Sequence, residues 1–228
     1  CTTAHFVNTG TLDKIGTEPA NFFSGIRYDD TTTGTITLNA GNLTLTAGTI
    51  TDWSPTVAAG TNLTIGFDTN SHPSGTFDAT GTGTVTWTGQ ITTTNDLVLS
   101  YEPGELVNQI NDWTPGPNTT ITNQSFLPFD SSTVIVDGFV NAIGATAQHA
   151  PSVSVTLAGG SVLANAGTWR LDTGSSINAS CCSDAHFVNT GTLDKIGTGN
   201  ASIASNVRVD DTTTGTLTVT AGNLNLTA

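Results

Sequence analysis

The chain repeats its own sequence at a distance of 181 residues. Segments 4–17 and 185–198 are identical, and both read AHFVNTGTLDKIGT. With a few substitutions the match continues between 27–47 and 208–228. We divide the chain into one complete repeat, 1–181, and the start of the next, 182–228. Because this window opens in the middle of a repeating unit, we expect a fold that grows by adding similar units.

Thr and Gly dominate the composition, Met is absent and only 10% of the residues are charged. Thr, Val and Ile suit a pleated strand, whereas Gly, Asn and Asp suit turns. Short segments such as 35–38, 84–87 and 153–157 alternate apolar side chains with Thr or Ser. That two-residue period is typical of a strand with one buried face. These features predict an all-β fold.

Gly-Thr pairs mark strand starts, and several of them lie roughly 23–26 residues apart. That spacing suits one coil of a β-solenoid made of two or three strands and tight turns. Seven or eight coils would fill one repeat and, at ~4.8 Å per coil, advance it by roughly 35–40 Å. The alternative is a series of antiparallel β-sandwich modules. We favour the solenoid, because a sandwich formed from 182–228 would lack most of its strands.

Two stretches are expected to depart from the regular coils. Segment 101–130 contains four prolines, Pro103, Pro115, Pro117 and Pro128. Proline cannot donate to a strand ladder, so this segment is predicted to loop out or to cap a turn. Segment 142–152, AIGATAQHAPS, is predicted to be a second loop. Such loops are natural places for lateral contacts in a repeating fibre.

A seven-residue core, Phe-x-Asn-x-Gly-Thr-Leu followed by Lys, occurs at 6–12 with Lys14 and again at 187–193 with Lys195. Here the chain resembles the Thr/Asn/Gly-rich right-handed β-helix repeats of very large bacterial adhesin-like and autotransporter-like exoproteins. The resemblance is clearest at the two ends of the chain and loosest over 100–150. It implies a right-handed parallel β-helix, export, and a structural or adhesive role, and it says little about a ligand.

The formal net charge is −13, from 18 acidic and five basic residues. Nucleic-acid binding needs a basic surface, so we expect no nucleic-acid partner. No apolar run approaches the ~20 residues of a membrane helix, and we expect no membrane span in this segment. Low Lys, abundant Thr and Asn, and paired cysteines favour an extracellular or cell-surface protein. Seven Asn-x-Ser/Thr sequences are candidate glycosylation sites there: Asn42, Asn62, Asn118, Asn123, Asn178, Asn200 and Asn225.

The three cysteines are Cys1, Cys181 and Cys182, and Cys1 corresponds to Cys182 across the repeat. An array would carry one Cys pair per repeat, far from the next pair, whereas a disulfide needs its Cα atoms within ~7 Å. Three states remain open: crosslinks to a neighbouring chain or subunit, a vicinal disulfide, or free thiols. A zinc site is disfavoured, because zinc usually takes four ligands and only His186 is close in sequence.

Acidic pairs precede a Thr-Thr-Thr-Gly run in both copies, as Asp29-Asp30 and as Asp210-Asp211. Carboxylates at a turn are candidate Ca²⁺ ligands, and Ca²⁺ is the one cofactor that the sequence suggests. Neither an EF-hand nor a nonapeptide calcium motif accompanies them. We therefore favour the alternative, in which the pairs cap their turns as Asx residues.

Other recurring polar residues are interpreted as structural. Asn8 and Asn189, inside the seven-residue core, are expected to form side-chain amide ladders. Four of the five basic residues also form repeat pairs, Lys14 with Lys195 and Arg27 with Arg208. Duplication into each repeat fits a structural contact better than a single active site. We predict no enzymatic activity and no catalytic residue.

The large aromatic side chains are candidates either for core packing or for sugar stacking. Trp113 lies in the Pro-rich segment, which favours exposure and makes it a candidate glycan contact. The remaining ones are expected in strands as core or edge residues: Trp53, Trp87, Trp169, Tyr28 and Tyr101.

These observations predict a structural repeat unit of an extracellular fibre, filament or giant surface protein. Its partners would be copies of itself, assembled end to end by stacking β-coils. The competing hypothesis is an adhesive module that recognises glycans or a cell surface through loops 101–130 and 142–152.

Overall fold

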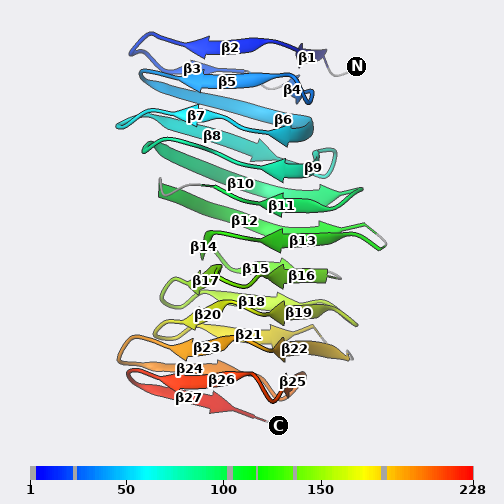
Figure 1. Ribbon diagram of the computed structural model, residues 1–228, viewed down its shortest axis with the longest axis vertical. Coiled ribbons are helices and arrows are strands. Elements are labelled where there is room, and N and C mark those ends of the chain that lie inside the picture. Colours follow the sequence, from blue (N-terminus) through cyan, green and yellow to red (C-terminus); the bar gives the residue numbers. More distant parts are fainter. Residues whose placement is uncertain are drawn as a thin grey trace.

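The computed structural model describes residues 4–22, 25–101, 105–116, 118–135, 138–180 and 184–227. Over these ranges the chain is a parallel β-solenoid of about nine turns, and its two termini lie at opposite ends of the stack (Figure 1). The predicted all-β solenoid is confirmed. The β-sandwich alternative is wrong, because strands of successive coils pair in parallel.

Each coil contributes strands to up to three faces of the solenoid. The first face contains β1 (Ala4–Asn8), β4 (Ile26–Asp30), β9 (His72–Phe77), β11 (Leu97–Leu99), β13 (Thr120–Asn123), β16 (Gly138–Asn141), β19 (Val162–Asn165), β22 (Ala185–Asn189) and β25 (Val207–Asp211). The second contains β2 (Thr11–Lys14), β5 (Thr35–Leu38), β7 (Thr56–Val57), β14 (Phe126–Phe129), β17 (Thr146–His149), β20 (Thr168–Leu171), β23 (Thr192–Lys195) and β26 (Thr216–Val219). The third contains β3 (Ala20–Asn21), β8 (Asn62–Phe67), β10 (Thr84–Thr93), β12 (Glu105–Pro115), β15 (Thr133–Ile135), β18 (Ser154–Leu157), β21 (Ser176–Ala179), β24 (Asn200–Ile203) and β27 (Asn223–Leu226).

One long strand, β6 (Asn42–Trp53), turns a corner of the solenoid without interruption. Its first half pairs with β3 and β8 on the third face, and its second half pairs with β4 and β9 on the first face. The register shifts near this corner, between Thr51 and Trp53 in the pairing with β9. Such a bulge bends the strand.

The period of the sequence equals eight coils of the structure. Eight steps along the first face lead from β1 to its repeat partner β22, through β4, β6, β9, β11, β13, β16 and β19. At ~4.8 Å per coil, one repeat advances the stack by roughly 38 Å. The predicted count of seven or eight coils therefore agrees with the structure.

Side chains alternate strictly between the interior and the surface along most strands. The strands β17, β18, β20 and β21 all alternate half-buried and buried residues. Aromatic rings stack through the interior from one copy of the repeat to the next, with centroids 4.7–6.3 Å apart. This column comprises Phe6, Tyr28, Trp53, Phe77, Trp87, Trp113, Phe139, Trp169 and Phe187.

Strands occupy much of segment 101–130 and the middle of segment 142–152, the two segments predicted to be irregular. Segment 101–130 carries β12, β13 and β14, and segment 142–152 carries β17 between tight turns. The prediction was wrong because proline can be accommodated at particular places in a strand. Among the described residues β14 is the edge strand of its five-stranded sheet, a position at which proline is tolerated, and Pro128 lies in it. Pro103 and Pro117 lie outside the described residues. Pro115 is the last residue of β12.

Candidate assembly surfaces at the ends of the solenoid

The two ends of the stack expose apolar side chains whose repeat partners are buried. Phe6, in the first coil, is 39% exposed, whereas its partner Phe187 is fully buried under the preceding coils. The last coil shows the same difference in reverse. Leu217, Val219 and Leu226 are 46–49% exposed, and their partners are at most 1% exposed: Ile36, Leu38 and Leu45.

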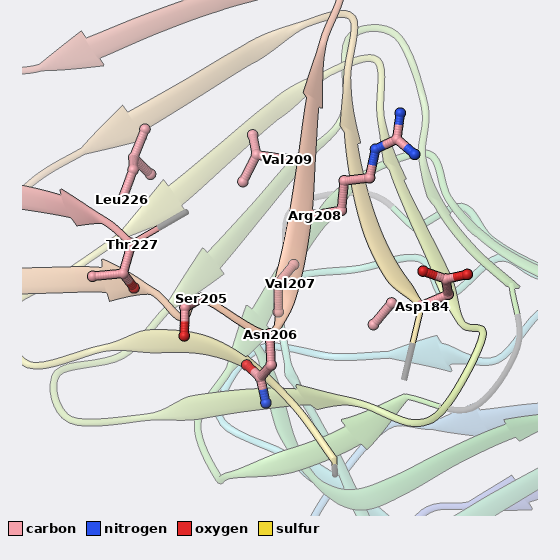
Figure 2. Close-up of a pocket in the computed structure, with 9 residues that line it drawn as sticks. Asp184, Ser205, Asn206, Val207, Arg208, Val209, Leu226 and Thr227 are labelled. Atoms are coloured by element: carbon pink, nitrogen blue, oxygen red, sulfur yellow. The ribbon is translucent and has the colours of Figure 1, made fainter. Parts of the chain in front are cut away.

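An open recess of about 620 Å³ lies at the C-terminal end of the stack (Figure 2). Val207, Val209 and Leu226 form its apolar part, and Arg208 lies at its edge. The complete lining is Asp184, Ala185, Ser205, Asn206, Val207, Arg208, Val209, Leu226 and Thr227. We call this the C-terminal recess. The apolar interior of the solenoid is open to solvent here.

A ladder of buried asparagines joins the last five coils along the first face. The Nδ2 atom of each residue donates to the side-chain oxygen of the next at 2.8–3.0 Å, in the order Asn123, Asn141, Asn165, Asn189 and Asp211. Each amide also donates to the carbonyl oxygen of a threonine one coil further on: Thr146, Thr168, Thr192 or Thr216. The predicted amide ladder is therefore confirmed at Asn189, whereas Asn8 donates to Tyr28, Asp30 and Thr35 and to no other asparagine in the described chain.

Asp30 and Asp211 occupy equivalent positions, and each accepts a hydrogen bond from the asparagine of the coil before it. Asn8 donates to Asp30, and Asn189 donates to Asp211. A carboxylate only accepts hydrogen bonds, so it cannot donate one to a side chain of the following coil. The Tyr28 hydroxyl donates to the other oxygen of Asp30 at 2.9 Å. Burial raises the pKa of the Asp30 carboxyl group.

The other carboxylate of each acidic pair faces outward and binds a histidine. Asp29 binds His5, and the Oδ2 atom of Asp210 lies 2.7 Å from Nδ1 of His186. The hydrogen bond from His186 lowers the pKa of Asp210. Asx-type turn capping was the expectation, but these carboxylates bind side chains one coil away and so connect neighbouring coils.

We predict that Gly34→Ala destabilises the protein by about 1–3 kcal/mol, because the site is already filled. A Cβ at Gly34 would lie 1.5 Å from the Asp30 carboxylate and 2.6 Å from the Asn8 carbonyl oxygen. Urea unfolding measures the effect. Gly10→Ala is the matched control, since its added methyl group meets no atom within 4 Å. Equal costs for the two variants would contradict the prediction.

The two repeated lysines bind backbone carbonyl groups at a corner of the solenoid. The Nζ atom of Lys195, which is fully buried, donates to Gly197 at 2.8 Å and to Ala221, in the next coil, at 3.4 Å. Lys14 makes the equivalent bond to Ala40 at 3.1 Å. The ammonium group therefore neutralises carbonyl dipoles and joins two coils.

Trp113 does not form the predicted glycan contact, because its side chain is fully buried in the aromatic column. The prediction was wrong because it assumed a loop at this position, whereas β12 continues through Trp113 and turns the ring inward.

Of the candidate glycosylation sites, Asn123 is buried in the amide ladder, which excludes it as a site in the folded chain. Four others are exposed: Asn42, Asn118, Asn200 and Asn225. Asn62 and Asn178 are half-buried.

The three cysteines, Cys1, Cys181 and Cys182, lie outside the described residues. Within the described ranges, no three His, Cys, Asp or Glu side chains gather closely enough to hold a metal ion. No helix with the length and apolar character of a membrane span occurs in the same part of the chain.

Three members of the ladder, Asn123, Asn141 and Asn165, were not predicted, although the sequence carries a signal for them. Each follows an apolar residue by two positions, and the four ladder asparagines are 18, 24 and 24 residues apart. The signal is obscured because the complete seven-residue core does not recur around these three residues. The pattern that identifies the ladder is an apolar residue followed two positions later by Asn, recurring at a distance of about one coil.

The geometry thus describes a stack of coils with two open, apolar ends. None of the protein-family models, curated proteins and solved structures compared with this chain matches it.

Proposed function

We propose that this chain is a structural repeat unit of an extracellular fibre, filament or giant surface protein, extended by stacking coil on coil. The single observation that carries the proposal is the difference in burial between the two copies. The same positions are buried wherever a further coil covers them and half exposed wherever none does. Covering them with another repeat would bury apolar surface, the main driving force for such stacking.

Two internal features support continuous stacking over many repeats. The aromatic column begins at Phe6 and reaches Phe187, the same position one repeat later. The hydrogen bond from an asparagine to an aspartate of the next coil also recurs, at Asp30 and Asp211. Equivalent interior positions recur after eight coils. A further eight coils could therefore stack on the last one in the same way.

The extracellular location is part of the proposal and rests on composition: a net charge of −13, few lysines and abundant Thr and Asn. The adhesive alternative is now supported by fewer observations than the structural one. It depended on exposure of Trp113 and on loops at 101–130 and 142–152, whereas the ring is buried and both segments contain strands.

Appending a second copy of residues 48–228 after Ala228 tests the proposal. We expect a monomer in which the added 181 residues form eight more coils, lengthening the particle by roughly 38 Å at constant cross-section. Small-angle X-ray scattering measures both quantities. We call this protein the extended chain.

A chain carrying a shuffled version of the appended residues is the control. It should lengthen the particle only as an unstructured tail does. The proposal fails if the extended chain behaves as two separate bodies, or if its added residues scatter like those of the shuffled control.

A further inference from the structure

Arg27 and Arg208 occupy the same place in the repeat but have different partners. Arg27 is buried and bonded to residues of later coils, whereas the Arg208 side chain is 69% exposed and folded back on its own strand. We propose that the C-terminal recess is a docking site for a coil with the sequence of residues 48–71. On docking, Arg208 leaves Asp210 and binds the carboxylate of that coil that corresponds to Asp68. The inference rests on the proposed function.

The first copy shows the partners that the docked coil would supply. The two guanidinium nitrogens of Arg27 lie 2.6 and 2.8 Å from the two carboxylate oxygens of Asp68, a bidentate pair. The same group donates to the Ser71 hydroxyl of that coil at 3.0 Å, and also to the carbonyl oxygen of Ala47, the residue that precedes the coil. Because of the hydrogen bonds from Arg27, the pKa of Asp68 is lowered to about 2.

The turn that carries Asp68 is also held by hydrogen bonds that do not involve Arg27. The backbone N–H of Asn70 donates to Asp68 Oδ1 at 2.9 Å, and the backbone N–H of Ser71 donates to the Asp68 carbonyl oxygen at 2.9 Å. The Ser71 hydroxyl accepts from the backbone N–H of Asp68 at 2.9 Å. A coil with this sequence therefore presents its carboxylate in a fixed position, which reduces the entropic cost of pairing.

The aspartates two positions after the arginines change partners in the same way. In the first copy, Asp29 Oδ1 accepts the backbone N–H of Thr49, from the coil that covers it, at 2.7 Å. In the second copy, the equivalent oxygen of Asp210 accepts Arg208 Nε at 2.7 Å. Arg208 and Asp210 thus bind each other where Arg27 and Asp29 bind the next coil.

The contact at Asp29 also restricts what can dock. A Cβ atom at Gly48 would lie 2.0 Å from Asp29 Oδ1, so the docked coil needs glycine at that position. The requirement for glycine and the Asp68 turn together favour a coil that begins with Gly-Thr and carries Asp-x-x-Ser 20 residues later. Stacking another part of the repeat on the recess would not supply both features together.

The apolar part of the recess fits the same occupant. Val209 and Leu226 correspond to Tyr28 and Leu45, which are buried in the first copy. There the ring of Trp53 packs 6.3 Å from that of Tyr28, and Leu45 is paired with Ile65. The docked coil would therefore fill the recess with the equivalents of Trp53 and Ile65.

Arg208→Ala, made in the original chain and in the extended chain, tests the proposal. In the original chain we expect the midpoint of thermal unfolding to change by less than ~2 °C, because an exposed ion pair contributes little. In the extended chain it should fall by at least ~3 °C, as with the matched variant Arg27→Ala in the original chain. Equal small effects of Arg208→Ala in both chains would overturn the inference.

A measurement on the unmutated proteins does not depend on how the variants fold. In the extended chain, the NMR resonance of Arg208 Nε–H should move from its position in the original chain to that of Arg27. An unchanged resonance in a lengthened particle would overturn this inference and leave the proposed function standing. A particle that does not lengthen would instead overturn the proposed function, and this inference with it.

Discussion

Asn165→Ala is expected to lower the free energy of unfolding by about 3 kcal/mol or more, because it breaks the amide ladder in the middle. The Asn165 side chain is fully buried and accepts a bond from Asn141 at 2.8 Å. It donates to Asn189 at 2.8 Å and to the Thr192 carbonyl oxygen at 3.0 Å. Alanine leaves buried donors and acceptors on both neighbouring coils without these partners, and each costs about 1–3 kcal/mol.

Urea unfolding and amide hydrogen exchange in β19 and β22 measure this cost. Asn42→Ala is the control, since Asn42 is an exposed residue of the third face, and it should change stability by no more than about 0.5 kcal/mol. If Asn165→Ala costs no more than Asn42→Ala, the ladder does not stabilise the stack.

Acid is expected to destabilise the protein between about pH 6.5 and pH 4 through His149. This fully buried side chain accepts a bond from the Trp169 indole N–H at Nε2, 3.1 Å away, and its Nδ1 lies 3.3 Å from the Val153 carbonyl oxygen. Both ring nitrogens are therefore used by the neutral form. Burial lowers the pKa of His149 from 6.5 to about 4.

The sign of the effect follows from which state binds the proton. Between pH 6.5 and pH 4 the unfolded chain protonates His149 and the folded chain does not, so stability falls as pH falls. The stabilisation is complete above pH 6.5, and its loss by pH 4 amounts to about 3 kcal/mol at most. The Asp68 carboxylate acts in a lower window, because its folded-state pKa of about 2 lies below its usual 3.8.

Denaturant unfolding at several pH values between 7.5 and 4 measures this dependence. His149→Gln should flatten the slope in that interval. His72→Gln is the matched control for the loss of a histidine side chain, because His72 is a half-buried residue of β9. A slope that persists in His149→Gln would assign the acid sensitivity to other groups.

Local sequence patterns predicted the architecture because a solenoid is built from neighbours in sequence. The alternation of apolar residues with Thr in 35–38 and 153–157 specifies which side chains turn inward. The recurrence of Gly-Thr at coil length specifies how far apart the corners lie. Proline was the exception, since Pro128 lies in β14, which is an edge strand among the residues that the structure describes. A residue's place at the edge of a sheet is not visible in its local sequence.

The candidate assembly surfaces were less predictable, because they depend on contacts between coils. Arg27 and Arg208 occupy the same position in closely similar segments, so no local pattern separates them. Their partners are 41 residues away in one copy and two residues away in the other. Similarly, Trp113 could not be assigned to the core before the strand through it was known.

The amino-acid sequence alone establishes that the start of the chain recurs 181 residues later, and its patterns indicate an all-β chain wound in coils of similar length. The folded structure adds that one repeat is eight coils, that an aromatic column runs through them, that an asparagine ladder joins the last five coils, and that apolar side chains are exposed at both ends of the described stack. Periodicity is a property of consecutive residues, whereas burial and pairing depend on which coil covers another. The same residue is therefore core in one copy and surface in the other.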